Sequence, residues 1–559
     1  MEMMKKIVNT TLGLVLVGSS VFAQSLADAK KAIDAEQYQK SKTILKGLTK
    51  AQPTNAENFF YLGNVYLKTE YTDSAKMTYD KGISANAEFP LNYVGLGAVA
   101  LATNNTAAAK SQFDKAISLT GRKEHQTYLF IGKAYTAAQK PDGAAAEAAL
   151  NKAKAINAKD AEIFLALGDA YRAQQKNSEA FSSYRTAFDM NKNLLRAKLE
   201  LGVLNKLSKA FPESVAQLNE IVALDPNYGP AYRELAETYY RWGNEQSSKW
   251  DENINQAVKY YEKYMDLTDR SLDSRERHAT FLILAKKYDE LEKEAQAMAQ
   301  MDKTNPRIFR YLGYSAYENE NYAASVQALQ DFIAKVDTSR IIPQDYLYLG
   351  RAQIKIPGSE TEGIKNLKKA IALDSSSIAV MSDIGKALFS AKKYADAAQT
   401  FDIAVNNPDS KTKAYDSFYL GMSHYFDYAT QVSAKQTPNK SLLAHADSAF
   451  SYVIEVAPTN PDSYLYRARV RKLVDDQENM QGLMVPDYEK YIEVVMAKPD
   501  ATSEARVKNT VIEAYKNLGA FYQTSDVAKA KDYFNKVIEL EPSDAYAQSA
   551  LKALAGSKN

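Results

Sequence analysis

The four histidines are the side chains of this chain whose ordinary pKa lies near neutral pH, which suits them to general-base catalysis and to metal binding. They are His125, His278, His424 and His445. The helical periodicity places His424 and His445 on opposite helices of one hairpin, so their rings can approach each other. Two imidazoles with no neighbouring carboxylate motif make a poor metal site. Packing or surface roles are therefore favoured over metal ligation.

The other residue types that carry chemistry form no catalytic pattern. There is no cysteine, which excludes a thiol nucleophile, a cysteine-based zinc site and a disulfide framework. His-Glu-x-x-His, Gly-x-Ser-x-Gly and Gly-x-Gly-x-x-Gly motifs are absent. Residues 358–365 are faintly similar to a phosphate-binding loop but lack Gly-Lys-Ser/Thr, and Glu360 and Glu362 would repel a phosphate, so we predict a turn. We expect a protein that is not an enzyme and uses no cofactor or metal, and an enzyme is kept as an alternative.

Both tryptophans lie in one segment that is longer than its counterparts elsewhere. Trp242 and Trp250 fall in an insertion near residues 241–256, beside Tyr240 and Arg241. Tryptophan, tyrosine and arginine are enriched among the residues that dominate protein interfaces. These four residues are our candidate partner-binding residues. The alternative is that both rings only pin an extended hairpin to its neighbours.

The elements that position these residues follow a repeat of about 34 residues. Residues 61–66 (YLGNVY) return as residues 165–171 (LALGDAY) and 311–317 (YLGYSAY). An alanine and an aromatic residue recur after this motif, as in the pairs Ala75/Tyr79, Ala180/Tyr184 and Ala397/Phe401. The apolar residues between follow a period near 3.6, which predicts pairs of helices joined by short polar turns.

This pattern resembles the tetratricopeptide repeat, and the resemblance covers essentially everything after Gln24. It implies an all-α fold, a right-handed superhelical solenoid of about 14 helix–turn–helix repeats. Residues 24–542 would form the array, with further insertions near 425–441 and 475–487, and residues 543–559 a C-terminal capping helix and tail. A small residue in each first helix lets its partner cross closely. Most of the 38 tyrosines are then expected to fill the space between helices, with a carbohydrate-stacking platform as the alternative.

The N-terminal residues predict export. Lys5 and Lys6 precede a short apolar stretch, and Val21-Phe22-Ala23 provides small residues at a cleavage site, so residues 1–23 are predicted to be a signal peptide. A buried N-terminal helix is the alternative. We expect a periplasmic protein, with cell-surface or secreted location as alternatives, of a Gram-negative, Bacteroidetes-like type. No later apolar run is long enough to span a membrane, and no cysteine can carry a lipid anchor. The balance of 70 basic and 68 acidic residues gives no reason to expect nucleic acid.

The resemblance implies a non-enzymatic scaffold or adaptor that binds a protein or peptide partner, such as part of an envelope secretion, outer-membrane assembly or motility complex. Family members that bind acidic C-terminal tails repeat asparagine with lysine and arginine along their first helices. Here the position after the small residue is occupied by Asn64, Ala98, Lys133, Asp169, Val203 and Glu237. A carboxylate-tail receptor is therefore not expected. The alternative function is envelope glycan or nutrient binding by exposed aromatic residues.

Overall fold

The computed structural model of the protein describes residues 25–408, 410–476 and 478–556. These residues contain 29 α-helices, four short 3₁₀ helices and no strand. The helices pair into fourteen successive hairpins within the described ranges, and α29 is left single at the C-terminal end. The all-α repeat fold predicted from the sequence is confirmed. The predicted signal peptide, residues 1–23, lies outside the described residues.

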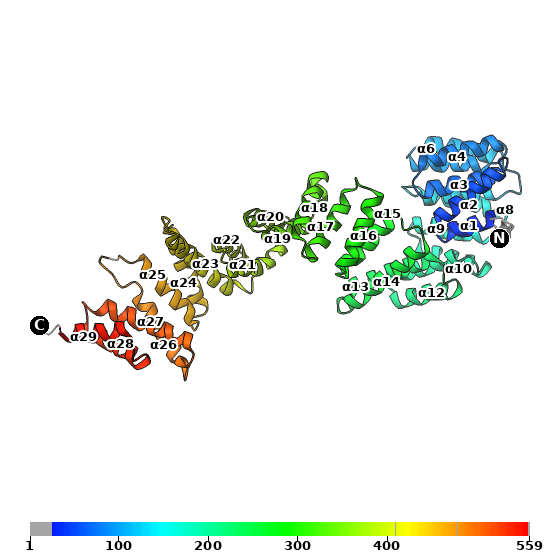
Figure 1. Cartoon of the computed structure of the whole chain (residues 1–559). Coiled ribbons are helices and arrows are strands. Elements are labelled where there is room, and N and C mark those ends of the chain that lie inside the picture. The colour runs from blue at the N-terminus through cyan, green and yellow to red at the C-terminus, as the bar shows by residue number, and fades with distance from the viewer. Residues whose placement is uncertain (1–24, 409, 477, 557–559) are drawn as a thin grey trace, which may run out of the picture. The chain divides into compact units, whose positions relative to one another are not determined.

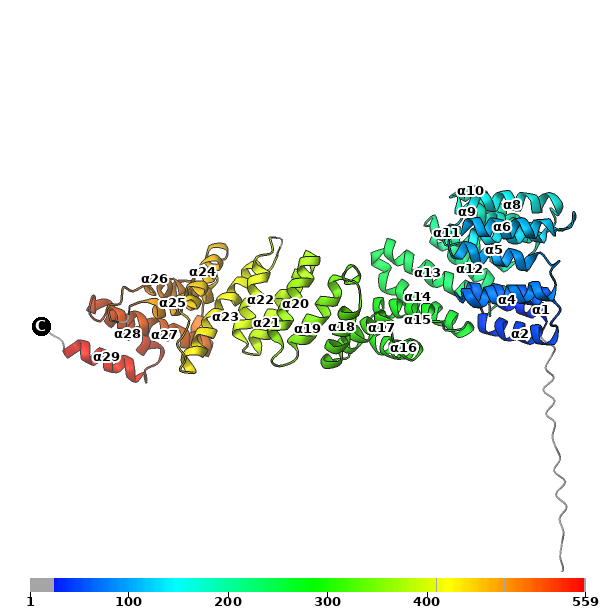
Figure 2. The same ribbon diagram turned by 90° about the horizontal axis from the view of Figure 1, so that it is seen from above.

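The chain divides into two compact units, and the first ends at Met301. Unit 1 contains eight hairpins, which lie side by side in chain order (Figures 1 and 2). Its helices are α1 (Leu26–Asp34), α2 (Tyr38–Ala51), α3 (Ala56–Lys68), α4 (Thr72–Ala85), α5 (Leu91–Ala102), α6 (Thr106–Ser118), α7 (Gln126–Ala137), α8 (Gly143–Ile156), α9 (Ala161–Ala173), α10 (Asn177–Met190), α11 (Leu195–Leu207), α12 (Phe211–Leu224), α13 (Gly229–Glu245), η1 (Ser247–Lys249), α14 (Trp250–Leu267), α15 (Leu272–Leu284) and α16 (Tyr288–Met301).

Unit 2 begins at Asp302 and contains six hairpins and the final helix. Its helices are α17 (Pro306–Glu318), α18 (Tyr322–Lys335), η2 (Thr338–Arg340), α19 (Pro343–Ile354), α20 (Glu360–Leu373), η3 (Ser375–Val380), α21 (Met381–Ser390), α22 (Tyr394–Val405), α23 (Lys413–Ser433), α24 (Ser441–Val456), α25 (Pro461–Val474), α26 (Val485–Met496), η4 (Ala501–Ser503), α27 (Ala505–Tyr522), α28 (Val527–Leu540) and α29 (Ala545–Gly556).

In several first helices the glycine is required by the ring or aliphatic side chain that faces it. A Cβ atom at Gly168 would lie 2.3 Å from the ring of Tyr184, which is fully buried. The Tyr184 hydroxyl donates a hydrogen bond to Asp169 at 2.9 Å. Tyr79 repeats this arrangement against Gly63. The two helices of a hairpin can therefore cross this closely only because the first one lacks a side chain at the crossing point.

The turns inside the hairpins share one backbone feature. Nine of them carry a non-glycine residue with positive φ, between 56° and 63°. A residue with a side chain adopts this left-handed backbone conformation at some cost in free energy. Its recurrence therefore marks a tight turn geometry that the hairpins share. These residues are Glu36, Glu70, Asn104, Gln175, Lys209, Lys286, Glu320, Lys392 and Lys435.

The structure shows how each predicted insertion is accommodated. The extra residues near 241–256 lengthen α13 and α14, and those near 425–441 lengthen α23 and fill the connection to α24. The third forms a loop between α25 and α26. There the Asp475 carboxylate accepts hydrogen bonds from four backbone N–H groups, those of residues 476, 481, 482 and 483, at 2.8–3.0 Å. One buried carboxylate thus organises this loop.

None of the helices described here has the length and apolar composition needed to cross a membrane.

Candidate partner-binding surfaces

The first helices of several successive hairpins lie side by side in each unit. Direct helix–helix contacts join α3 to α5, α5 to α7 and α7 to α9 in unit 1, and α21 to α23 and α23 to α25 in unit 2. We call the surface that these odd-numbered helices share the first-helix face. A partner lying on it would touch several hairpins at once, which is how solenoids build extended binding surfaces.

In unit 1 this face is crossed by ion pairs that join one first helix to the next, and we call this set the charge ladder. Its partners are 27 to 40 residues apart in the sequence, so each pair joins different positions on the first helices of two neighbouring repeats. The pairs are Lys30–Glu57, Lys133–Glu162, Arg172–Glu200, Arg196–Asp169, Lys206–Glu234 and Arg277–Glu237.

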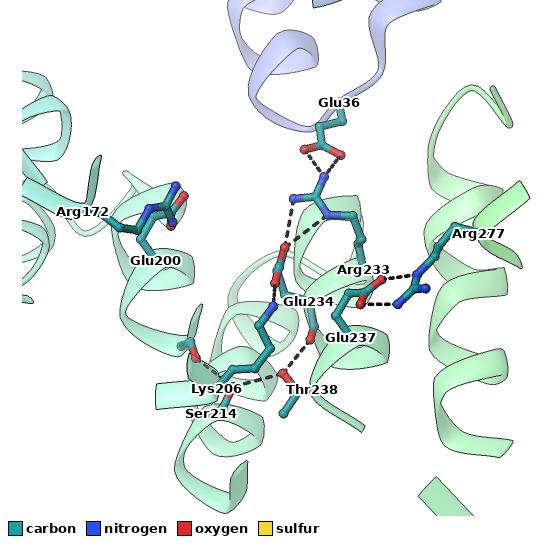
Figure 3. A network of polar contacts seen from close by, with 11 residues as sticks. Glu36, Arg172, Glu200, Lys206, Ser214, Arg233, Glu234, Glu237, Thr238 and Arg277 are labelled. Atoms are coloured by element: carbon teal, nitrogen blue, oxygen red, sulfur yellow. Dashed lines mark hydrogen bonds and ion pairs between the residues drawn. The ribbon is translucent and has the colours of Figure 1, made fainter. Parts of the chain in front are cut away.

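The most buried pair of the ladder is Lys206 with Glu234 (Figure 3). These residues are 8% and 9% exposed. The second oxygen of Glu234 accepts from Arg233 at 3.1 Å, and Arg233 reaches on to Glu36. Burial acts to raise the pKa of Glu234, but Lys206 and Arg233 hold it below its usual value. Both charges are therefore compensated, and the ladder presents no unmatched charge here to a ligand.

In unit 2 the pairs Arg310–Asp345 and Arg469–Glu513 continue this pattern, but α23 breaks it. Helix α23 carries six aromatic residues, and none of them is fully buried. Their rings continue onto neighbouring helices. We define the aromatic strip as Phe389 of α21, Tyr419, Met422, Tyr425 and Phe426 of α23, and Tyr466 of α25, all of them half-buried.

The rings of the aromatic strip contact one another in series. Centroids of Phe389 and Tyr419 are 5.3 Å apart, and those of Phe389 and Phe426 are 5.9 Å apart. Tyr425 lies 5.3 Å from Phe426 and 5.9 Å from Tyr466. The strip thus extends over the first helices of three hairpins as one apolar surface with a few tyrosine hydroxyls.

The aromatic strip occupies positions that elsewhere hold the charge ladder. Met422 directly follows the small residue Gly421, just as Asp169 follows Gly168 and Glu237 follows Ala236. The same repeat position therefore carries a charge in three hairpins of unit 1, at Lys133, Asp169 and Glu237, and methionine in α23. The dense run of aromatics in residues 415–428 was visible in the sequence, but we predicted core roles for the tyrosines as a group.

The sequence-predicted partner residues do not share one surface. Tyr240 packs edge-on against Phe281 at 5.7 Å and lies under Arg277, whereas Arg241 is exposed. Trp242 stacks with Phe211 and Tyr239, at 6.0 and 6.1 Å. The ring of Trp250 packs against Gly243. A Cβ atom placed on Gly243 would be in about van der Waals contact with that ring. These contacts favour the pinning alternative, while a role in partner binding stays a prediction.

The contacts of the histidines fit packing roles. His424 and His445 approach as predicted, with ring centroids 5.1 Å apart. Burial, and next the neighbouring His445, lowers the pKa of His424 to about 4. His125 lies 2.8 Å from Asp160. In the described residues no three His, Cys, Asp or Glu side chains are grouped so that they could hold a metal ion.

The segment around Gly358 is the predicted turn between α19 and α20. Gly358 has a positive φ of 89°, and its N–H donates to the Glu360 carboxylate at 2.7 Å. This backbone N–H is thus already bonded to a carboxylate, whose charge would repel a phosphate.

Residues 165–229, which run from α9 into the start of α13, match the family model of the tetratricopeptide repeat. Together with the repeated hairpins, this match confirms the resemblance: the chain carries tetratricopeptide repeats. Proteins of this class are generally non-enzymatic scaffolds for protein–protein interaction. No curated protein matches the chain.

Three solved structures are similar to parts of the chain. The C-terminal part of a repeat-containing protein from Cytophaga hutchinsonii is 24% identical, covering 49% of this chain and 98% of its own, with a TM-score of 0.34. PilF of Pseudomonas aeruginosa is 18% identical, covering 42% and 97%, with a TM-score of 0.32. A tetratricopeptide repeat protein from Parabacteroides merdae is 16% identical, covering 45% and 94%, with a TM-score of 0.30.

Proposed function

We propose that this protein is an exported scaffold that holds an apolar segment of a partner protein on the aromatic strip of unit 2. The observation that carries this proposal is the exposure of α23. A helix with six aromatic residues would normally bury most of them, because each ring removed from water contributes stability. Here all six remain partly in contact with solvent.

The chemistry of the strip selects its partner. Rings and a methionine offer large apolar contact with little charge, and methionine adapts to irregular surfaces. The tyrosine hydroxyls add hydrogen-bonding groups along the edge. A segment with aliphatic or aromatic side chains at successive positions fits this surface better than an acidic or basic one. A preformed surface of this kind also lowers the ordering cost of binding.

The proposed location is the periplasm, with the cell surface as the alternative. It rests on the sequence of residues 1–23, whose charged start, short apolar stretch and small residues before Gln24 follow the pattern of a cleaved signal peptide. A component of an envelope secretion, outer-membrane assembly or motility complex is the partner we propose. N-terminal sequencing of the protein from the envelope fraction tests the proposed export, since export predicts a chain that begins at Gln24.

Site-specific photo-crosslinking tests the aromatic strip. A photoreactive phenylalanine analogue is placed at Met422 or Phe426, and as a matched control at Leu373, an exposed apolar residue at the end of α20. We expect the two strip positions to yield the same one or two partner proteins and the control to yield neither. The same products from Leu373, or none from the strip, would contradict the proposal.

A further inference from the structure

The first hairpin of unit 1 contacts the seventh, although five hairpins separate them along the chain. Glu36, in the turn between α1 and α2, forms an ion pair with Arg233 of α13. Both carboxylate oxygens lie 2.5–2.6 Å from one guanidinium nitrogen (Figure 3). Tyr264 of α14 donates a hydrogen bond to the same carboxylate at 2.9 Å. We call the junction between these two hairpins the clasp.

Two more hydrogen bonds of the clasp lie at the start of α2. The side chain of Gln37 donates to the carbonyl of Leu267 at 3.1 Å. The backbone N–H of Gln39 donates to the Asp269 carboxylate at 2.7 Å. Helix α2 has no side-chain cap of its own, so Asp269, in the turn between α14 and α15, supplies the anion that a helix N-terminus prefers. The first hairpin therefore depends on the end of the seventh for this cap.

The backbone of the first hairpin lies against the start of α13. Ala35 is buried in an apolar cluster with Leu218 and Tyr228, and it is the one described residue of the first hairpin in that cluster. A Cβ atom at Gly229, the first residue of α13, would lie 3.4 Å from the carbonyl oxygen of Ala35. The two hairpins thus approach closely while burying little apolar surface of the first one.

The clasp is specific to these two hairpins. Glu36 is one of nine turn residues that share a positive φ, and the other eight are exposed, whereas the Glu36 side chain is only 18% exposed. Leu267 ends α14 and is half-buried. The last residues of α10, α12 and α16, which are Met190, Leu224 and Met301, are 41–61% exposed. Two positions that meet solvent in those other hairpins therefore meet protein here.

The clasp changes how a perturbation can travel through unit 1. In an open solenoid each hairpin contacts only its neighbours, so stability is a sum of terms between adjacent repeats. A bond between the first and seventh hairpins closes this series into a loop. We propose that the clasp is a latch that couples the two ends of the loop, so that release of one end loosens the other directly, without loosening the hairpins between them.

The composition of the clasp suits a latch that opens. Its bonds are polar, and water can replace them at a small net cost for each one. The apolar part from the first hairpin is a single alanine, Ala35. The latch does not depend on the aromatic strip, which belongs to unit 2, so either proposal can fail without the other.

Hydrogen exchange of the full chain, read by mass spectrometry, tests the coupling. Asp269→Ala removes the cap that the end of the seventh hairpin supplies, and the readout is α1 and residues 42–51 of α2, away from the broken bond. We expect exchange there to become about tenfold faster, as loss of a helix cap predicts, while α5 to α8 stay within about twofold of the parent chain. Because coupling is reciprocal, Glu36→Gln should in turn speed exchange in α13 and spare α5 to α8.

Arg277→Met is the matched control. Arg277 of α15 also pairs with a carboxylate of α13, that of Glu237, at 2.6–2.7 Å, and this pair lies outside the clasp. Its loss should loosen α13 and α15 and leave α1 and α2 unchanged. Circular dichroism checks that each variant is folded.

A distance measurement tests whether the latch opens. Spin labels are placed on Lys46→Cys of α2 and Lys263→Cys of α14, which are exposed positions in a chain without native cysteine. Double electron–electron resonance should report one population of distances in the parent chain. The combined variant Glu36→Gln/Asp269→Ala should add a second, longer population, whereas Arg277→Met should not.

Three results would overturn the proposal. Exchange like that of the parent chain in α1 and α2 of folded Asp269→Ala, or in α13 of folded Glu36→Gln, would show that the two ends are not coupled. Equal acceleration in α5 to α8 would show that the effect passes from neighbour to neighbour. A single, unchanged distance in the combined variant would show that the first hairpin stays in place without the clasp, which is then no latch.

Discussion

Replacing Lys206 by methionine tests whether the charge ladder stabilises the stack of hairpins. Methionine keeps the length and most of the apolar stem of lysine, so the main change is the loss of the ammonium. Removing one partner of a buried ion pair costs about 3–5 kcal/mol, because the other charge is left uncompensated. Glu234 keeps the hydrogen bond from Arg233 at 3.1 Å, and a hydrogen bond to a charged group contributes about 1.5–3 kcal/mol. We therefore expect a loss of about 2 kcal/mol.

Hydrogen exchange read by mass spectrometry is the suitable assay, because a solenoid unfolds locally and its stability is a sum over neighbouring repeats. A loss of about 2 kcal/mol should speed exchange roughly 30-fold in peptides from α11 to α13 and leave α3 to α5 unchanged. Lys76→Met is the matched control, since its pair with Asp80 is exposed and contributes little. The double variant Lys206→Met/Glu234→Gln should recover part of the loss. Exchange within about threefold of the parent chain, or an equal effect from the control, would refute the reasoning.

The remaining predictions concern packing and pH. Gly168→Ala should cost about 1–3 kcal/mol, because its Cβ would meet the buried Tyr184 ring at 2.3 Å, whereas Gly202→Ala should cost much less, because it meets only the flexible Leu218 at 3.1 Å. Thermal denaturation of both variants checks this, and equal losses would contradict it. Burial raises the pKa of Asp34 to about 6, so its contribution to stability is fully present below its ordinary pKa of 3.8 and is lost as pH rises through about 6. Asp34→Asn should therefore flatten the dependence of melting temperature on pH between 4 and 7, by an amount that solvent contact of the carboxyl keeps small. A parallel pH dependence in the variant would count against this assignment.

Most of the fold could be predicted from the sequence because its determinants are local. The small residue, the aromatic that faces it and the turn recur within one repeat, so Gly168 and Tyr184 identify a hairpin without any distant information. The last helix, α29, begins within two residues of its predicted start at Ser543. The insertions were harder, since a polar run such as residues 431–441 does not show that α23 absorbs part of it as extra helix.

The sites depend on relations that a single repeat does not contain. The charge ladder leaves a weak signal, opposite charges on the first helices of neighbouring repeats, as in Arg172 and Glu200. The ion pair between Glu36 and Arg233 leaves none, because these residues are 197 positions apart and meet only through the summed curvature of the hairpins between them. The aromatic strip left a sequence signal that could be seen but not interpreted. Its residues were visible, but burial distinguishes a core ring such as Tyr79 from a half-buried one such as Phe426, and burial follows from packing.

The measurement that tests the central claim most directly is the affinity of the crosslinked partner for purified protein with and without the aromatic strip. The partner is titrated against the parent chain, Phe426→Ala, Tyr466→Ala and the control Leu373→Ala. If the strip holds the partner, each strip variant should weaken binding by about tenfold or more, as truncation of an interface anchor does, while Leu373→Ala binds like the parent. Unchanged affinity in both strip variants, with their helicity intact, would contradict the account.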